Sequence, residues 1–412
     1  MTATKPYVIV GASLAGAKAA EGLRAAGYDG PITLIGDETE RPYERPPLSK
    51  DYLLGKSERE VIYVHPPEWY ADSGVDLRLG ISATSIDRAA HEASLSDGST
   101  AGYAKLLLAT GSSPRRLQVP GGDLDGVLYL RRVGDSDRLK KAFAGASRVA
   151  VIGGGWIGLE TTAAARAAGA EVTVLEMADL PLVRVLGPEV ARIFADLHTE
   201  HGVSVRCGVQ VAEVTGQNGK VTGVRLADGR VVEADTVVAG VGITPNTQLA
   251  VEAGLEVDNG VWVDAQLRSS DPDIYAAGDV ANAYHPILRK HIRVEHWANA
   301  LNQPQTAARA MLGEDVAYDR MPYFFTDQYD LGMEYTGYVE PGGYSRVVFR
   351  GDTERREFIA FWLDHDERVL AGMNVNVWDA TDTIREIVRG GRPVDASALS
   401  DLAVPLETLA GS

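Results

Sequence analysis

The sequence contains a single cysteine, Cys207, among its 412 residues. No disulfide can therefore form within the chain, which fits a reducing cytoplasm. Chemistry that needs one thiolate to attack and a second to resolve is excluded as well. Cys207 ends a strand-like segment, Val203–Cys207, and we expect it to be inert.

Long apolar runs and an excess of basic residues are also absent. Lys and Arg number 40 against 57 Asp and Glu, and the net charge of −17 argues against a nucleic-acid partner. No apolar run approaches the length that spans a bilayer. Strand-like Tyr7–Val10 leaves no room for a secretory signal before it, so a cytoplasmic protein with no membrane partner is expected. The eight histidines show no ligand spacing, so no metal site is expected.

Two dinucleotide-binding fingerprints are present. The first runs from Val8 to Gly16 and the second from Val149 to Glu160. Each reads as an apolar strand, a glycine-rich turn and the start of an Ala-rich helix. Such a turn lets the backbone approach a pyrophosphate, and the helix N-terminus supplies positive potential. Two fingerprints predict two dinucleotides in one protein, and hence electron transfer between them.

Acidic residues follow each fingerprint at the spacing that suits an adenosine ribose. Asp37 and Glu38 lie 26 and 27 residues after Gly11, and Glu176 lies 23 residues after Gly153. A carboxylate accepts hydrogen bonds from a ribose 2′-hydroxyl and repels a 2′-phosphate. No arginine immediately follows Glu176, so we expect the second site to prefer NADH to NADPH.

The order of segments predicts an α/β protein with two Rossmann-like domains of glutathione-reductase type and a C-terminal α+β interface domain. The last ninety residues are aromatic and strand-rich, with a helix expected at Asp382–Arg389. Trp362 and Trp378 in this region, with Trp297, are candidates for an electron exit, although most such aromatics form core. The expected domains are a discontinuous first nucleotide-binding domain (1–111 and 245–318), a second nucleotide-binding domain (112–244) and the C-terminal domain (319–412).

Several segments, in order along the chain, resemble the NADH-dependent ferredoxin reductases of Rieske dioxygenase and cytochrome monooxygenase systems. These are flavoproteins with two dinucleotide sites, of the putidaredoxin-reductase and biphenyl-dioxygenase-reductase type. Two positions depart from the expected pattern: Ser13 replaces the central glycine of the first fingerprint, and His296 replaces a small or hydroxyl residue. The matching segments are Arg45–Lys50, Ala109–Gly111, Gly153–Glu160, Gly278–Asp279, Glu295–Ala300 and Asp327–Gln328.

The resemblance implies non-covalent FAD at the first fingerprint. Ser13 is compatible with FAD if its backbone keeps a negative φ. His296 has either a structural role or a role in tuning the flavin. The residues that the resemblance assigns to FAD are Gly11, Ser13, Leu14, Ala15, Gly16, Asp37, Glu38, Arg45, Lys50, Ala83, Thr110, Gly111, Arg131, Asp279, Glu295, His296 and Trp297.

The resemblance also implies NADH at the second fingerprint, with Lys50 and Glu160 as the catalytic pair. Glu160 would face the nicotinamide and pair with Lys50. The residues assigned to NADH are Gly153, Gly155, Ile157, Gly158, Glu160, Glu176, Arg184, Gly242 and Ile243.

The implied activity is electron transfer from NADH, one electron at a time, to a [2Fe-2S] ferredoxin that serves an oxygenase. A quinone or rubredoxin reductase, or a redox-sensing scaffold flavoprotein of the apoptosis-inducing-factor type, stays open as an alternative. The missing cysteine in Tyr43–Lys50 makes thiols and peroxides poor substrates. We expect a monomer. A basic grouping that would suit an acidic ferredoxin comprises Arg289, Lys290, Arg293, Arg309 and Arg320.

Overall fold

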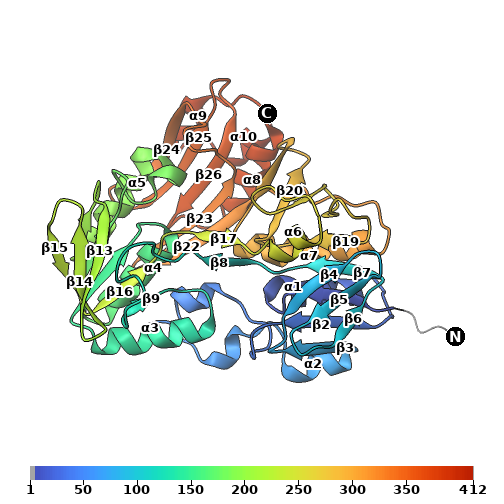
Figure 1. The fold of residues 1–412 in the computed structure, drawn as a ribbon. Helices are drawn as coiled ribbons and strands as arrows, with labels where there is room; N and C mark the ends of the chain where they lie inside the picture. The colour runs from blue at the N-terminus through green and yellow to red at the C-terminus, as the bar shows by residue number, and fades with distance from the viewer. Residues whose placement is uncertain (1–4, 412) are drawn as a thin grey trace. The chain divides into compact units, whose positions relative to one another are not determined.

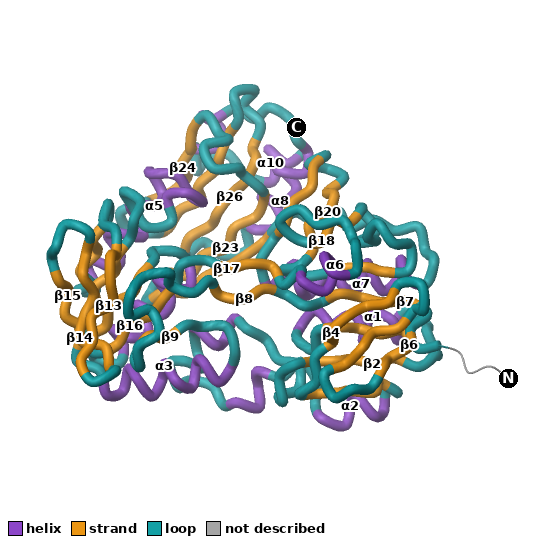
Figure 2. Tube along the Cα trace, viewed as in Figure 1, coloured by secondary structure: helices purple, strands orange, loops and turns teal. Residues whose placement is uncertain are grey.

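A computed structural model describes residues 5–411 (Figures 1 and 2). The chain divides into two compact units, each built from three segments. The first unit contains residues 1–44, 59–113 and 243–322, and the second contains 45–58, 114–242 and 323–412. The segment 45–58 thus belongs with residues far along the chain, whereas the three domain boundaries expected above stay a prediction.

The first unit is built on a five-stranded parallel sheet with the order β19-β7-β1-β2-β3. Its central strands are short apolar runs, as expected of a sheet buried on both faces. Helices α1 (Leu14–Ala25) and α7 (Trp297–Met311) pack closely because Gly22 has no side chain; a Cβ there would lie 3.2 Å from Cβ of Ala308. The strands are β1 (Tyr7–Val10), β2 (Ile32–Gly36), β3 (Val75–Leu79), β7 (Lys105–Leu108) and β19 (Ile274–Ala276).

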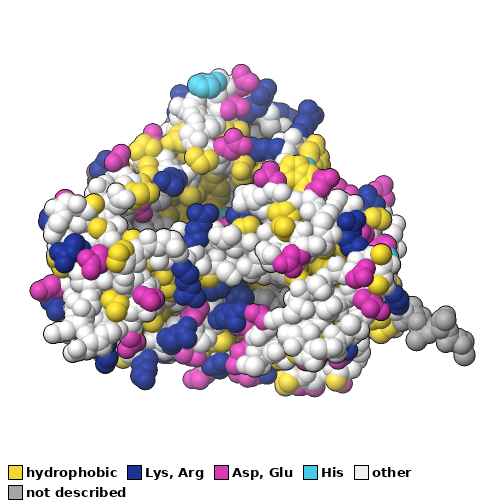
Figure 3. Space-filling view, in the orientation of Figure 1, with side chains coloured by type: hydrophobic (Ala, Val, Ile, Leu, Met, Phe, Trp, Pro, Cys, Tyr) yellow, Lys and Arg dark blue, Asp and Glu magenta, His cyan; other side chains and the backbone are white. Residues whose placement is uncertain are grey.

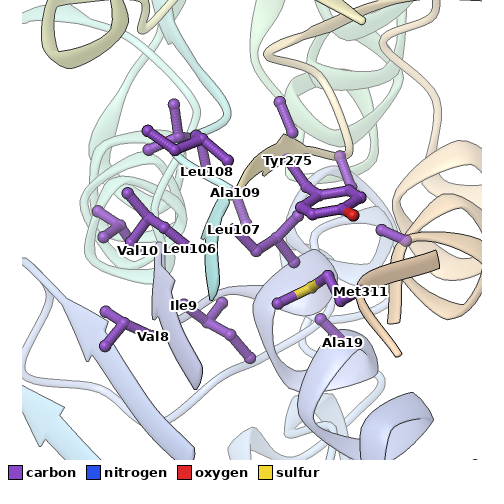
Figure 4. Packing of buried hydrophobic residues seen from close by; sticks show 14 of the residues in the cluster. Val8, Ile9, Val10, Ala19, Leu106, Leu107, Leu108, Ala109, Tyr275 and Met311 are labelled. Atoms are coloured by element: carbon purple, nitrogen blue, oxygen red, sulfur yellow. The ribbon is translucent and has the colours of Figure 1, made fainter. Parts of the chain in front are cut away.

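Figure 4 shows the core of this unit, where side chains of β1 and β7 lie beside Tyr275 and Met311. Smaller sheets and short helices complete the unit. They are η2 (Arg59–Ile62), α2 (Pro67–Asp72), β4 (Ala83–Asp87), β5 (Glu92–Leu95), β6 (Thr100–Gly102), β17 (Ile243–Pro245), α6 (Gln248–Glu252), β18 (Val261–Val263), β20 (Ala281–His285) and β21 (Lys290–Arg293). Strand β8 (Ser112–Pro114), which pairs with β17, carries the chain into the second unit.

The second unit contains a parallel sheet of the same kind, ordered β12-β11-β10-β16-β9, with a small antiparallel sheet, β13-β14-β15. The elements of this part are η1 (Pro46–Ser49), β9 (Val127–Leu128), α3 (Val133–Gly145), β10 (Arg148–Ile152), α4 (Trp156–Ala167), β11 (Glu171–Leu175), α5 (Val183–Glu200), β12 (Ser204–Arg206), β13 (Val211–Gln217), β14 (Lys220–Leu226), β15 (Val231–Glu233) and β16 (Thr236–Ala239).

An antiparallel sheet ordered β22-β23-β26-β25-β24 follows in the same unit. Its inner face packs against α4 and α5 in one apolar cluster. Trp362 is fully buried there and donates a hydrogen bond from Nε1 to the Leu186 carbonyl at 3.0 Å, so it is core; Trp378 is exposed. The elements are β22 (Tyr323–Gln328), β23 (Leu331–Gly337), β24 (Arg346–Asp352), β25 (Glu357–Leu363), β26 (Val369–Val375), α8 (Thr381–Gly390), α9 (Ala396–Ser400) and α10 (Glu407–Ala410).

The two parallel sheets and the C-terminal antiparallel sheet with its helices confirm the expected fold class. Between residues 5 and 411, no helix has both the length and the apolar character to cross a bilayer.

Candidate active site

The outer glycines of the first fingerprint are required by the fold itself. Gly11 has φ +118°, and a Cβ on it would lie 2.1 Å from the carbonyl oxygen of Ala109, the residue after β7. A Cβ on Gly16 would lie 2.0 Å from the Gly11 carbonyl oxygen. Both distances are far inside van der Waals contact, so the strand–turn–helix packing excludes any side chain at these positions.

The second fingerprint repeats this geometry. Gly153 has φ +102°, and a Cβ there would lie 2.3 Å from the Gly240 carbonyl oxygen. A Cβ on Gly158 would lie 2.0 Å from the Gly153 carbonyl oxygen. The two turns are therefore built by the same backbone contacts.

The middle position of each turn differs, because no contact within the protein forbids a side chain there. Gly155 has φ −80°, and a Cβ on it would meet no heavy atom within 4 Å. Ser13 occupies the matching place with φ −119°. The negative φ meets the condition stated above for serine. The open space at Gly155 is a cradle that a side chain would fill, which fits a bound pyrophosphate.

The acidic residues lie after β2 and β11. Glu38 accepts a hydrogen bond from the Tyr43 hydroxyl at 2.5 Å, whereas Asp37 is exposed. Glu176 accepts from the backbone N–H groups of Gly154 at 2.6 Å and Ala178 at 2.7 Å. These bonds fix the Glu176 carboxylate against the second glycine turn, and each oxygen keeps a lone pair for a ribose hydroxyl.

A second cluster of predicted residues lies at the end of β19. Gly278 has φ +81° and donates its N–H to Gln303 at 2.9 Å, and Asp279 accepts from the Ser112 hydroxyl at 2.7 Å. His296 precedes α7 as its N-cap. Burial lowers the pKa of His296 to about 4, although its side chain keeps some solvent exposure, and the nearby Asp279 carboxylate only partly opposes the shift. The imidazole is therefore neutral at pH 7.

The other residues assigned to FAD do not all share one unit. Thr110 and Gly111 follow β7, and Thr110 exchanges two 2.8 Å hydrogen bonds with Asn246. Trp297 donates to Glu44 at 3.2 Å. Residues of the first unit are Leu14, Ala15, Ala83, Thr110, Gly111, Glu295 and Trp297, whereas Arg45, Lys50 and Arg131 belong to the second unit. Within the second unit, Arg45 donates to the Arg131 carbonyl.

The structure brings together the two residues expected to be catalytic. Lys50 Nζ donates to Glu160 Oε1 at 2.7 Å, and their side chains are 13% and 4% exposed. Two hydroxyl groups also donate to the Glu160 carboxylate, those of Ser49 and of Thr326, the latter at 2.6 Å. A buried charge needs such partners, because an unpaired ion in a protein interior is costly. Glu160 thus has three donors from two segments.

Ser49 and Thr326 were not predicted. Ser49 directly precedes Lys50, and Thr326 directly precedes the matching segment Asp327–Gln328. Phe324, Thr326 and Gln328 are buried on one face of β22, but the sequence of this strand gives no signal that distinguishes that face. Of the other NADH candidates, Ile157 and Arg184 are exposed, Gly242 has φ +95°, and Ile243 begins β17 in the first unit.

The cradle at Gly155 generates a paired prediction. Gly155→Val is expected to leave the thermal unfolding temperature close to that of the wild type but to weaken NAD⁺ binding about tenfold or more, because its branched side chain, larger than that of Ser13 at the matching position, enters the open turn. Gly158→Ala is expected to cost roughly 2–4 kcal/mol of stability through its backbone clash. Calorimetric titration measures the NAD⁺ affinity, and thermal unfolding measures the stability. Equal stability losses in the two variants would contradict the assignment of the turn at Gly155 to the pyrophosphate.

A second prediction concerns His198, which is fully buried on α5. Burial lowers its pKa from 6.5 to about 4. Below pH 6.5 the unfolded chain binds a proton that the folded protein does not, so stability falls as the pH decreases. The loss between pH 7.5 and 5 is about 2 kcal/mol for this residue.

The measurement is urea unfolding of wild type and His198→Phe at both pH values. The wild type should lose about 2 kcal/mol more than the variant. Equal losses would show that His198 is not buried in its neutral form.

Comparisons with known proteins agree with this geometry. Residues 5–304 match the family described as pyridine nucleotide-disulphide oxidoreductase, and residues 323–410 match the family described as reductase C-terminal. The chain is 39% identical to putidaredoxin reductase of Pseudomonas putida over 99% of this chain and 97% of that protein. It is 42% identical to the ferredoxin–NAD⁺ reductase component of the anthranilate 1,2-dioxygenase system of Burkholderia cepacia, over 98% of each chain.

A solved structure agrees as well. The crystal structure of the covalent putidaredoxin reductase–putidaredoxin complex contains a chain that matches with a TM-score of 0.95 and 38% identity, covering 100% of this chain and 99% of that one. The family and these relatives imply FAD and NADH as the cofactors, in accordance with the two glycine turns. The chain belongs to the pyridine nucleotide-disulphide oxidoreductase family and carries its reductase C-terminal module.

Proposed function

We propose that the protein is an FAD-dependent NADH:ferredoxin oxidoreductase. It oxidises one NADH to NAD⁺ and a proton, and it reduces two molecules of a [2Fe-2S] ferredoxin that serves an oxygenase. The observation that carries the proposal is the pair of glycine turns in a chain that matches named ferredoxin reductases over its whole length. When bound, FAD supplies the conversion between two-electron and one-electron transfer.

The chain's own residues hold the two dinucleotides and the charge between them. The Gly11–Gly16 turn cradles the FAD pyrophosphate, and the Gly153–Gly158 turn cradles that of NADH. Lys50 would be the catalytic cation, since a positive charge held near a bound cofactor would stabilise the negative charge of its reduced form. Glu160 holds that ammonium group at 2.7 Å and keeps it from turning toward solvent.

Glu176 gives the second site its preference for NADH. Its carboxylate is fixed by two backbone donors beside the glycine turn, where it would meet the 2′-phosphate of NADPH. Two negative charges in contact repel each other, and this repulsion costs binding free energy for NADPH alone.

The preference generates a coenzyme prediction. NADH should reduce the protein with a kcat/KM at least about 100-fold above that of NADPH. Glu176→Gln should lower this NADH-to-NADPH ratio of kcat/KM about tenfold, because the amide keeps an acceptor oxygen but loses the negative charge. Steady-state rates with a small artificial acceptor measure the ratio. Comparable kcat/KM values for the two coenzymes in the wild type would refute the role of Glu176.

A basic surface on the first unit is the proposed docking place for the ferredoxin. Of the five predicted residues, Arg293 forms an ion pair with Glu295 and Arg309 forms one with Glu314. Among the described residues, Arg289 and Arg320 make no ion pair with an acidic side chain. Basic and acidic side chains are interspersed on the face seen in Figure 3. Exposed cations without an acidic neighbour attract and orient an acidic partner.

The function is tested by mixing the NADH-reduced protein with ferredoxins from the same cell. We expect electron transfer to at least one of them, with a rate that falls about tenfold or more between 50 and 500 mM salt, because opposite charges attract less when screened. Turnover with a small neutral acceptor is the control and should change little. Arg289→Glu/Arg320→Glu should lower the ferredoxin rate alone.

Other outcomes would assign a different function. Fast turnover with rubredoxin or a quinone, and none with any ferredoxin, would identify a different acceptor. Slow reduction by NADH with no competent acceptor would indicate a redox-sensing scaffold. The proposal also includes a cytoplasmic location and a monomeric state. Sedimentation of the holoprotein would test the monomeric state.

A further inference from the structure

The buried face of β22 carries two polar side chains. Thr326 and Gln328 are each 1% exposed, and both belong to the same face of the strand as Phe324. A polar group buried without a hydrogen bond costs free energy, so these side chains need partners inside the protein.

Their partners form a continuous chain of hydrogen bonds that ends at Glu160. His198 Nε2 lies 2.8 Å from Gln328 Oε1, and Gln328 Nε2 donates to Thr326 Oγ1 at 3.2 Å. Thr326 Oγ1 donates to Glu160 Oε1 at 2.6 Å, the oxygen that also accepts from Lys50. The chain links α5, β22, α4 and the residue after η1.

The direction of every bond follows from the charge at one end. The Glu160 carboxylate, paired with Lys50, can only accept, so the Thr326 hydroxyl must donate to it. That hydroxyl then accepts from the Gln328 amide nitrogen, which turns the Gln328 oxygen toward His198. His198 must therefore carry its proton on Nε2.

The contacts at the other end of this hydrogen-bond series, at His198, agree with this direction. His198 Nδ1 is then an acceptor, and the Tyr329 hydroxyl lies 3.3 Å from it. Tyr329 stacks on His201, with ring centroids 3.8 Å apart. Burial lowers the pKa of His198 to about 4, so the imidazole stays neutral at pH 7 and only one of its nitrogens donates.

We propose that Thr326, Gln328 and His198 are positioning residues that act through Glu160 to hold the Lys50 ammonium group at the place where it assists hydride transfer from NADH. This inference rests on the proposed roles of Lys50 and Glu160. Every hydrogen bond in this series is donated in the direction of the Glu160 carboxylate. Each side chain therefore has one rotamer and one orientation that satisfy its neighbours. The C-terminal sheet thereby sets the geometry of a residue that lies more than 270 positions earlier in the chain.

The first test compares hydroxyl-deleting and hydroxyl-keeping variants of the holoprotein. Thr326→Val removes the donor to Glu160 at nearly constant volume, whereas Thr326→Ser keeps it. Thr336→Val is the matched control, because Thr336 is also 1% exposed, lies on the neighbouring strand β23, and its hydroxyl has no hydrogen-bond partner among the described residues.

The readout is the rate constant of flavin reduction at saturating NADH. We expect Thr326→Val to be about tenfold slower and both other variants to stay within about twofold of the wild type, with NAD⁺ affinity unchanged in all three. A Thr326→Val rate equal to that of the wild type would overturn the proposal. So would an equal slowing in Thr336→Val, since that would indicate a general packing effect.

The second test needs no activity. Nitrogen-15 spectra of histidine-labelled protein report which imidazole nitrogen carries the proton, and the His198 signals are assigned by their absence in His198→Phe. We expect a protonated Nε2 and an unprotonated Nδ1 in the wild type, and a mixture of tautomers in Thr326→Val, where the Gln328 amide is free to flip. A single Nδ1-protonated tautomer in the wild type would overturn the directed chain.

The two readouts separate this proposal from the proposed function. If NADH fails to reduce the wild-type protein, the function fails, and the His198 tautomer still decides whether the directed chain exists. If the wild type is reduced rapidly and Thr326→Val is too, the function stands and the positioning role fails.

Discussion

The buried negative charge of Glu160 is the constraint around which the second unit is arranged. A carboxylate that is 4% exposed has lost nearly all of its water and must find donors in the protein. Its donors come from the end of η1, from the lysine that follows, and from β22 in the C-terminal sheet. Two segments that are remote in sequence therefore meet at α4. The C-terminal sheet thus supplies one of the three donors to this carboxylate.

The dinucleotide turns could be predicted from the sequence because their requirements are local. A strand that passes directly into a helix brings Gly11 and Gly16, or Gly153 and Gly158, so close to backbone oxygens that an added Cβ would lie only 2.0–2.3 Å from them. Only glycine fits there, and the spacing of the glycines is fixed by the turn. The parallel sheets follow from the same short motif, since each fingerprint strand is a buried apolar run. The pairing of Lys50 with Glu160 could be predicted from the resemblance to the ferredoxin reductases.

The remaining site residues could not be predicted in this way because they depend on pairing between distant segments. Thr326 and Gln328 are polar residues on a strand, and alternation alone does not say which face is buried. Their burial follows from the packing of β22 against α4, which no local pattern encodes. The placement of 45–58 with the second unit is likewise a consequence of tertiary contacts, such as the hydrogen bond from Ser136 to the Leu48 carbonyl at 2.8 Å.

The strand order of the first unit has a consequence for biosynthesis. Strand β19 (Ile274–Ala276) pairs with β7, and α7 packs against α1, so the unit lacks an edge strand and a covering helix until about three quarters of the chain has left the ribosome. The parallel sheet of the second unit is complete once β16 ends at Ala239. Long-range pairing is slow because loop closure precedes it. The parallel sheet of the second unit is encoded within a shorter stretch of sequence. It is thus able to form before the last strand of the first unit's sheet, β19, has been synthesised.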